Sequence, residues 1–384
     1  MDNPFIIERA VKGAQLVDRL VEVEQVKAAL TRGGKLFVIG PRRFGKTSIL
    51  QTAVAQLQDE GRRVISLNVE GYTSLELLIR AIVSAAAGFS GNVKQATASL
   101  KRFFGNLNPS FTFNPNEGTF DATLGIKAAE PHEQAPILIE ALNNLERLAA
   151  QSKQKVGLVL DEFQHLLTLG GPNVEGQLRA AIQLHEHVGY VFAGSQTSLL
   201  TDMIVNPARP FYRLGEPLFI KEVPWPDFLV YLRAGFAKLK CKAEDETFAY
   251  LYQLAEGVPY HVQLLARAGW DEVSRNPKRQ LTRADIDAAQ HTLTYLFDPY
   301  HASLWAGLTT NQQKALRLIA QNITNGMTAK LTLKQADLTA GTMSKSLLAL
   351  ERMNIIRKEV AQATQQYRFE DPLFKQWILA TIKG

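Results

Sequence analysis

The chain has 384 residues, of which 46% are hydrophobic and 21% are charged, a composition typical of globular proteins rather than disordered ones. No apolar run reaches the roughly 20 residues that a membrane-spanning helix needs, and the first residues lack the layout of a secretion signal. The single cysteine, Cys241, excludes an intrachain disulfide and a cysteine-based zinc cluster. We therefore expect two or three domains, no membrane contact and a cytoplasmic location.

The net charge of +6 falls entirely within residues 301–384, which contain eleven Lys or Arg and five Asp or Glu. Residues 1–300 are therefore neutral overall. A local basic excess suits a surface that binds polyanions, but it also occurs on ordinary solvated surfaces. Charge alone leaves both interpretations open.

Short apolar runs alternate with helical patterns in the first 225 residues. Strands are expected over 35–39, 63–69, 156–160, 190–194 and 218–220, and a helix over 46–60. This alternation predicts an α/β domain over residues 1–225, with a parallel sheet flanked by helices. Residues 109–126 instead alternate apolar and polar residues around Asn116-Glu117-Gly118, which predicts a β-hairpin within an insertion at about 87–131.

The rest of the chain predicts two further domains. Residues 226–303 are expected to be wholly helical. Residues 304–384 predict helices over 309–320, 334–338 and 342–353, extended runs over 355–360 and 366–369, and a last helix from about Pro372. Three helices followed by a β-ribbon is the element order of a winged helix.

The segment GPRRFGKT, residues 40–47, matches the G-x-x-x-x-G-K-[ST] pattern of a phosphate loop between a strand and a helix. Its glycines allow backbone N–H groups to surround a phosphate, and the following helix adds its positive end. We expect Lys46 to neutralise the β- and γ-phosphates and Thr47 to hold Mg²⁺. The predicted nucleotide-binding residues here are Gly40, Pro41, Arg42, Arg43, Phe44, Gly45, Lys46, Thr47 and Ser48.

Two later strands end in polar residues. The run VGLVLDEF places Asp161 and Glu162 at a strand end, where Asp161 can hold Mg²⁺ and Glu162 can activate the attacking water. In FAGSQTSLL, Ser195 or Gln196 can bond the γ-phosphate or the water. The alternative is that Ser195 or Thr197 serves as an N-cap for the next helix.

Phosphoryl transfer also uses a positive charge beyond the metal and the lysine. Arg213 and Arg209 follow the fourth strand, whereas Arg42 and Arg43 lie within the phosphate loop. We favour Arg213 or Arg209, although any of the four could pair with a surface acid instead.

Together these motifs resemble the archaeal-type ATPase family, which is related to STAND signalling ATPases and to origin-recognition ATPases within the additional-strand catalytic-glutamate group of P-loop proteins. The stretches that carry the resemblance are GPRRFGKTSIL, LVLDEFQHL, FAGSQTSLL, VDRLVEVEQVKAAL, EGVPYHVQLLA and FEDPLFKQWI. The resemblance implies a helical lid and a C-terminal winged helix. It also implies that Arg19 packs near the base with Glu22 and that Pro259 lies against adenine.

The resemblance implies an ATPase that uses ATP and Mg²⁺, and no Asn-Lys-x-Asp guanine motif is present. Pro259 stands where a sensor arginine is often found, with Arg267 further along, and no arginine finger stands out. Both features favour a nucleotide-controlled switch over a ring-forming motor.

Two partner classes remain open, with ATP-dependent oligomerisation compatible with either. In one, the winged helix binds duplex DNA through Ser344, Lys345 and Arg352, with Arg357 and Lys358 reaching phosphates. In the other, a STAND-like ATPase uses the lid and winged helix to bind protein.

Overall fold

The computed structural model describes residues 2–7, 16–89, 109–114, 119–124, 131–171, 173–276, 278–361 and 364–382. The chain divides into two compact units. The first, here named the sheet unit, comprises Arg19–Gly40 and Lys46–Ile220. The second, the helical unit, comprises Met1–Asp18, Pro41–Gly45 and Lys221–Gly384.

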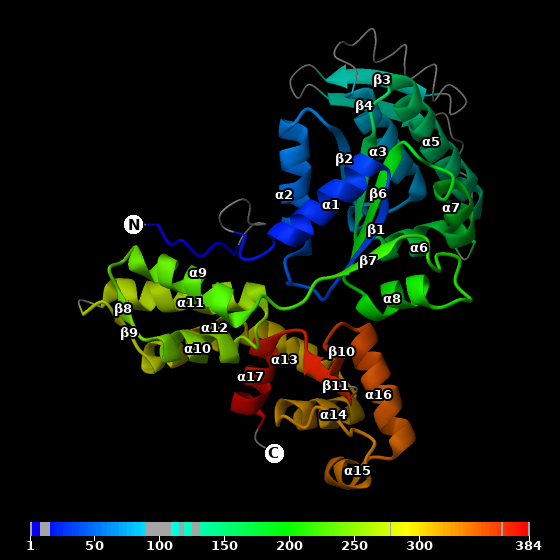
Figure 1. The fold of residues 1–384 in the computed structure, drawn as a ribbon. Helices are drawn as coiled ribbons and strands as arrows, with labels where there is room; N and C mark the ends of the chain where they lie inside the picture. The colour runs from blue at the N-terminus through cyan, green and yellow to red at the C-terminus, as the bar shows by residue number, and fades with distance from the viewer. Residues whose placement is uncertain are drawn as a thin grey trace. The chain divides into compact units, whose positions relative to one another are not determined.

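The sheet unit is built on five parallel strands in the order β2-β5-β6-β1-β7 (Figure 1). The strands are β1 (Lys35–Ile39), β2 (Arg63–Asn68), β5 (Val156–Asp161), β6 (Val188–Gly194) and β7 (Glu216–Phe219). All five expected strands and the α/β class are confirmed. Because β6 lies between β1 and β5, the three strands that end in the phosphate loop and the polar motifs are neighbours.

Helices cover both faces of this sheet. They are α1 (Leu20–Arg32), α2 (Lys46–Asp59), α3 (Leu75–Ala87), α5 (Pro131–Ser152), α6 (Gln164–Gly170), α7 (Val174–Ile182) and α8 (Thr197–Val205), with a 3₁₀ turn η2 (Val69–Gly71). Phe37, Leu158 and Phe192 share one core with α3, α5 and α7. On the other face, a Cβ at Gly189 would lie 2.5 Å from the backbone oxygen of Leu30, so this glycine lets α1 pack closely.

The expected hairpin is present as β3 (Pro109–Asn114) and β4 (Thr119–Leu124), which pair antiparallel. Its turn, Asn116-Glu117-Gly118, lies outside the described residues.

The first part of the helical unit contains α9 (Trp225–Ala237), α10 (Asp245–Leu254), α11 (Pro259–Arg275), α12 (Arg283–Leu296) and α13 (Asp298–Ala306). The expectation that residues 226–303 are wholly helical is wrong in one respect, since β8 (Lys242–Ala243) pairs in parallel with β9 (Gln280–Leu281). Two-residue strands are too short to show an alternating pattern. Phe5 is fully buried in the core of these helices.

The segment after α13 forms what we call the C-terminal module. It consists of α14 (Thr310–Ala320), α15 (Lys330–Ala336), α16 (Ala340–Arg352), β10 (Ile356–Ala361), β11 (Thr364–Phe369) and α17 (Pro372–Thr381). The order of three helices, an antiparallel ribbon and a final helix follows the expectation, although α15 begins four residues earlier than residue 334. The module has its own core, which includes Leu316, Leu347 and Trp377.

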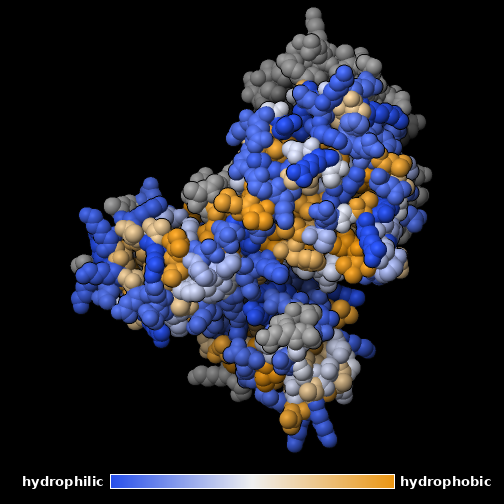
Figure 2. Space-filling model, viewed as in Figure 1, coloured by the Kyte–Doolittle hydropathy of each residue, from blue (hydrophilic) through white to orange (hydrophobic). Residues whose placement is uncertain are grey.

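The face of the molecule drawn in Figure 2 is mostly hydrophilic, with hydrophobic residues in several small groups. Leu331 of α15 and Leu20 of α1 are among the exposed apolar residues, at 83% and 74%. Isolated exposed apolar side chains are common on globular proteins. Among the helices that the structure describes, none combines the length and the apolar character needed to cross a bilayer.

Candidate functional site

The phosphate loop follows β1 and leads into α2, as expected, and its two glycines meet different needs. Gly45 has φ +88, a conformation that side-chain-bearing residues rarely adopt. A Cβ on Gly40 would lie 2.8 Å from the Cβ of Ile220. Gly45 is therefore required by the backbone turn, and Gly40 by close packing against the segment after β7.

Lys46 and Thr47, the first residues of α2, join the loop to the neighbouring strand ends. Lys46 is buried, and its Nζ donates to the backbone oxygen of Gly40 at 2.8 Å. The Thr47 hydroxyl donates to Asp161 Oδ2 at 3.0 Å. The next residue, Ser48, is buried within α2. The structure thus brings the start of α2 and the end of β5 into direct contact.

Asp161 is buried at the end of β5. Burial is the main influence on its carboxyl group and raises its pKa, with a smaller contribution from the negative charge of Glu162. The hydrogen bond from Thr47 and the charge of Lys46 act in the opposite direction without cancelling the effect of burial. A cation beside Asp161 would favour its ionised form.

Glu162 adopts a left-handed conformation with φ +50, which is unusual outside glycine and occurs often at functional sites. Its Oε2 accepts hydrogen bonds from Ser195 Oγ at 2.7 Å, Ser195 N at 3.2 Å and Gln164 Nε2 at 2.6 Å. Burial opposes the charge of this carboxylate. The bonds from Gln164 and Ser195 and the charge of Lys46 outweigh burial, so the pKa of Glu162 is lowered.

Ser195 is buried directly after β6, and its hydroxyl is directed to Glu162. The alternative of an N-cap at Ser195 or Thr197 does not hold, because α8 begins at Thr197 with Gln196 in the N-cap position. Ser195 therefore contacts the carboxylate rather than the helix end.

Gln164 is a contact that the sequence did not single out. A Cβ on Gly194 would lie 2.2 Å from Gln164 Oε1, so the side chain occupies the space that this glycine leaves free. The only indication in the sequence is the position of Gln164 two residues after Glu162. That spacing alone does not predict a contact across the sheet to the end of β6.

The arginines proposed for phosphoryl transfer have different surroundings. Arg209 forms an ion pair with Glu175 at 2.7 Å, which agrees with the alternative that it pairs with an acid. Arg213 has φ +54, and its guanidinium lies 5.0 Å from the ring centroid of Tyr212. Arg42 is exposed, whereas Arg43 bonds to Asp371 within the helical unit at 2.7 Å.

The residues assigned to the base lie in different units. In the sheet unit, Arg19 precedes α1, is buried and donates to Glu22 at 2.9 Å. In the helical unit, Pro259 is buried at the first position of α11, where a proline fits without loss of a helix hydrogen bond. Pro41, the second loop residue, is partly buried.

The donors at the loop suit a magnesium ion bound together with a nucleotide. Mg²⁺ is usually held by one or two protein oxygens plus phosphates and water, rather than by a cage of side chains. Thr47 and Asp161 supply a hydroxyl and a carboxylate that already touch. Within the described part of the chain, no cluster of three His, Cys, Asp or Glu side chains forms a metal cage.

Arg357, one of the basic residues expected to contact DNA, is buried rather than exposed. Arg357 of β10 is only 5% exposed, and it bonds to Glu359 and to the Phe369 carbonyl, both at 2.6 Å. The expectation that Arg357 reaches DNA phosphates is therefore wrong, because the side chain is buried and its Nε and Nη1 bond to Glu359 and to the Phe369 carbonyl within the module. Lys358, one position on, is exposed.

Comparison with known proteins agrees with this geometry. Residues 16–265 match the model of a family described as an ATPase domain predominantly from Archaea. No curated protein matches the sequence.

Solved structures show the same fold at low sequence identity. A Walker-type ATPase of Pyrococcus abyssi, PABY2304, is 17% identical with a TM-score of 0.64, and the alignment covers 98% of this chain and 99% of that one. The ORC2 protein of Aeropyrum pernix, in ADPNP–ADP complexes, is 14% identical with a TM-score of 0.53, covering 98% of both chains. With the phosphate loop, the acid pair and the sheet order in place, the chain belongs to the family of P-loop ATPases found predominantly in Archaea.

Proposed function

We propose that this protein binds ATP with Mg²⁺, hydrolyses it to ADP and phosphate, and acts as a nucleotide-controlled switch. The observation that carries the proposal is the contact of Thr47 with Asp161 beside a Glu162 that Ser195 and Gln164 hold in place. A hydroxyl and a carboxylate that could bind a metal ion thus lie next to the phosphate loop, beside a carboxylate whose pKa is lowered.

In this proposal, Lys46 leaves the Gly40 carbonyl and neutralises the β- and γ-phosphates. Thr47 and Asp161 would hold the Mg²⁺, whose charge would offset the charge that develops on the phosphate oxygens. Glu162 accepts a proton from water as the water oxygen forms a bond to the γ-phosphorus and the bond to the β–γ bridging oxygen breaks. ADP and inorganic phosphate are the products.

Two features of Glu162 suit a general base. Its lowered pKa keeps it ionised at neutral pH, and because three hydrogen bonds engage Oε2, Oε1 is the oxygen that would accept the proton from water. Ser195 is then a positioning residue for Glu162, and Arg213 is proposed to supply the additional positive charge. Arg19 and Pro259 are proposed to contact the base, and adenine is favoured because a guanine motif is absent.

The test is ATP binding by calorimetry with Lys46→Ala. We expect binding to be lost or weakened at least a hundredfold, because the phosphate charge loses its principal cation. Lys27→Ala is the control, since Lys27 pairs with Glu24 and Glu60 in the same unit. Equal affinity of Lys46→Ala and wild type would contradict the proposal.

The exposed basic residues of the C-terminal module support duplex DNA as a partner, bound in the manner of a winged helix. The exposed basic residues of the module, for which no ion pair occurs within the described chain, are Lys330, Lys334, Lys345, Arg352 and Lys358. Lys345 and Arg352 lie on α16 together with exposed Ser344. The alternative, a protein partner, is supported by Leu348 and Met353, which are 49% and 48% exposed on and just after the same helix.

Fluorescence anisotropy with a labelled duplex separates these partners. Binding to DNA should weaken steeply as salt is added, because each phosphate contact releases counterions. Lys345→Ala combined with Arg352→Ala should reduce both the affinity and the salt dependence. Lys238→Ala, at the C-cap of α9, is the control. A lack of binding at low salt would exclude DNA and favour the protein partner.

A further inference from the structure

Arg43 of the phosphate loop is held by α11. Its backbone is left-handed, with φ +67, which is unfavourable for any residue with a side chain. Its carbonyl oxygen accepts a hydrogen bond from Tyr260 N at 3.3 Å, and its guanidinium lies 5.2 Å from the centroid of the Tyr260 ring. The first turn of α11 therefore contacts both the backbone and the side chain of this strained residue.

The Arg43 guanidinium, whose side chain is 38% exposed, also bonds to a polar cluster whose histidines are buried. Its Nη1 donates to Asp371 Oδ2 at 2.7 Å and lies 3.0 Å from His261 Nε2. His261 is 1% exposed, and burial lowers its pKa to about 3, so the neutral ring can accept a hydrogen bond at Nε2. Burial opposes the charge of Asp371, but His301, His261 and Arg43 outweigh it and hold the pKa of Asp371 well below its ordinary value.

Phe44, which follows Arg43 in the phosphate loop, contacts the C-terminal module. Phe44 is 2% exposed, and the Arg357 guanidinium lies 5.2 Å from the centroid of its ring. Arg357 is fixed in turn by Glu359 and by the carbonyl of Phe369. Two consecutive residues of the phosphate loop are thus held by α11 and the C-terminal module.

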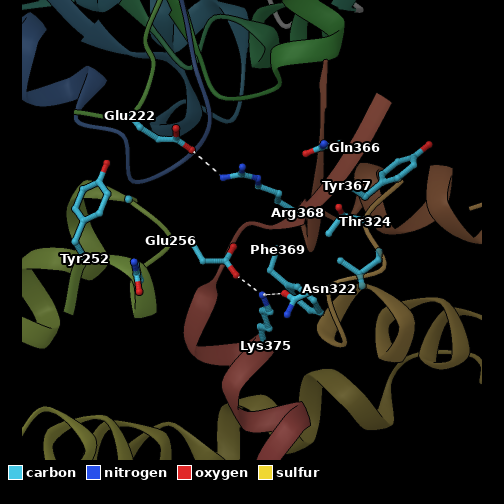
Figure 3. Close-up of a pocket in the computed structure, with 13 residues that line it drawn as sticks. Glu222, Tyr252, Glu256, Asn322, Thr324, Gln366, Tyr367, Arg368, Phe369 and Lys375 are labelled. Atoms are coloured by element: carbon cyan, nitrogen blue, oxygen red, sulfur yellow. Dashed lines mark hydrogen bonds and ion pairs between the residues drawn. The ribbon is translucent and has the colours of Figure 1, made fainter. Parts of the chain in front are cut away.

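Asp371 itself is firmly placed at the start of α17. Its Oδ1 accepts from a backbone N–H of the first turn at 2.9 Å and caps the helix. On either side along the chain, Arg368 pairs with Glu222 at 3.2 Å and Lys375 with Glu256 at 2.5 Å. Both pairs, drawn in Figure 3, line a cavity of about 450 Å³ together with the turn before α11, strand β11 and the segment after α14.

We propose that Asp371 is a positioning residue for nucleotide binding, which acts through Arg43 to hold the left-handed turn of the phosphate loop. The inference rests on the proposed function, because it assigns regulation to the same loop. Its consequence is that the C-terminal module sets nucleotide affinity, so that a partner that displaces the start of α17 releases the loop.

The first experiment is calorimetry of ATP and ADP with Asp371→Asn. Asparagine keeps the helix cap but removes the charge that holds Arg43. We expect the Kd for both nucleotides to rise on the order of tenfold, within the usual range for coupled sites. Asp337→Asn is the matched control, since Asp337 is an exposed carboxylate of the same module that pairs with Lys314. Unchanged affinity of Asp371→Asn would overturn the inference.

A second experiment separates positioning from a general loss of structure. Glycine adopts φ +67 without strain, so Arg43→Gly should bind nucleotide at least fivefold more tightly than Arg43→Ala, although both lack the guanidinium. In the Arg43→Gly background, Asp371→Asn should have no further effect. Equal affinities of the glycine and alanine variants, or a full additional loss in the double variant, would contradict the role of the turn.

Failure of this inference is distinguishable from failure of the proposed function. If wild-type protein does not bind ATP, or Lys46→Ala binds as well as wild type, the proposed function is wrong. If both behave as expected and the Arg43 and Asp371 variants bind like wild type, only the positioning role is wrong. Far-ultraviolet circular dichroism of each variant checks that the helices remain intact.

Discussion

Asp161 and Glu162 are adjacent in sequence, yet their surroundings shift their pKa values in opposite directions. Burial dominates at Asp161 and raises its pKa, while hydrogen bonds at Glu162 overcome burial and lower it. A pair of acids with divergent environments can divide two roles between them. Here the arrangement suits a metal ligand at Asp161, ionised by the cation, and a base at Glu162.

The substitution Glu162→Gln tests whether Glu162 is the base while Asp161 is the metal ligand. The amide keeps the size of the side chain but cannot accept a proton from water, so we expect turnover to fall by on the order of a hundredfold or more while ATP affinity stays within about threefold of wild type. Phosphate release and calorimetry provide the two measurements. Glu186→Gln, at an exposed site before β6, is the control. Undiminished hydrolysis would take the base role away from Glu162.

Gly194→Ala tests the support of Glu162 from the neighbouring strand. The new methyl group would meet Gln164 Oε1 at 2.2 Å and Leu200 Cδ1 at 2.5 Å, so Gln164 must move away from Glu162. We expect turnover to fall about tenfold or more with little change in ATP affinity, because positioning errors of this size affect chemistry more than binding. Gly176→Ala, where a Cβ meets nothing within 4 Å, should retain activity. Equal turnover in both variants would show that Gln164 is not needed.

At the scale of single elements, helix α14 shows how local chemistry sets a boundary. Thr309 accepts a hydrogen bond from Gln312 N at 3.3 Å, and the Gln312 side chain accepts one from Thr309 N at 2.8 Å. This capping box satisfies N–H groups that the helix cannot pair internally. The start of α14 was therefore predictable from residues 309–312 alone.

Thr309→Ala should lower the unfolding free energy of the C-terminal module by about 1 kcal/mol, as for other lost N-caps. Urea unfolding followed by tryptophan fluorescence is the measurement, because Trp305 and Trp377 pack in or against the module core. Thr310→Ala, one position inside the helix, should change stability by a few tenths of a kcal/mol at most. Equal effects of both substitutions would contradict the capping role.

At the scale of the whole molecule, all four tryptophans lie in one unit. Trp225, Trp270, Trp305 and Trp377 belong to the helical unit, so tryptophan fluorescence follows that unit alone. The same unit contains the buried cluster of His261 and Asp371. Its stability can therefore be measured against pH without interference from the sheet unit.

We expect the helical unit to lose stability as pH falls below about 6.5. The pKa of His261 is lowered from 6.5 to about 3. Between these pH values His261 is therefore protonated in the unfolded chain but neutral in the folded protein. Stability then declines by up to about 1.4 kcal/mol per pH unit. The lowered pKa of Asp371 adds a loss of the same sign below its ordinary value of 3.8. His261→Gln should flatten the pH dependence between 4 and 6.5, and an unchanged slope would exclude His261 as its source.

Much of the site was predictable because its parts are local patterns. The phosphate loop needs one strand, two glycines and one helix in sequence, and Asp161 and Glu162 directly follow an apolar run. Parallel strands place their carboxyl ends at one edge of the sheet, so the meeting of Thr47 with Asp161 could be expected. Periodicity alone could not predict the two-residue strands β8 and β9, which are too short to show it.

The sequence by itself determined the phosphate loop, the acid pair, the α/β class and the cap of α14, since each depends on residues close together in the chain. Only the tertiary structure decided which polar groups meet. It directed Ser195 and Gln164 to Glu162, buried Arg357 beside Phe44, and paired Arg43 with Asp371, 328 residues later. The physical reason is that a side chain's charge and hydrogen-bonding groups are local, whereas burial and the choice of partner depend on packing between distant segments.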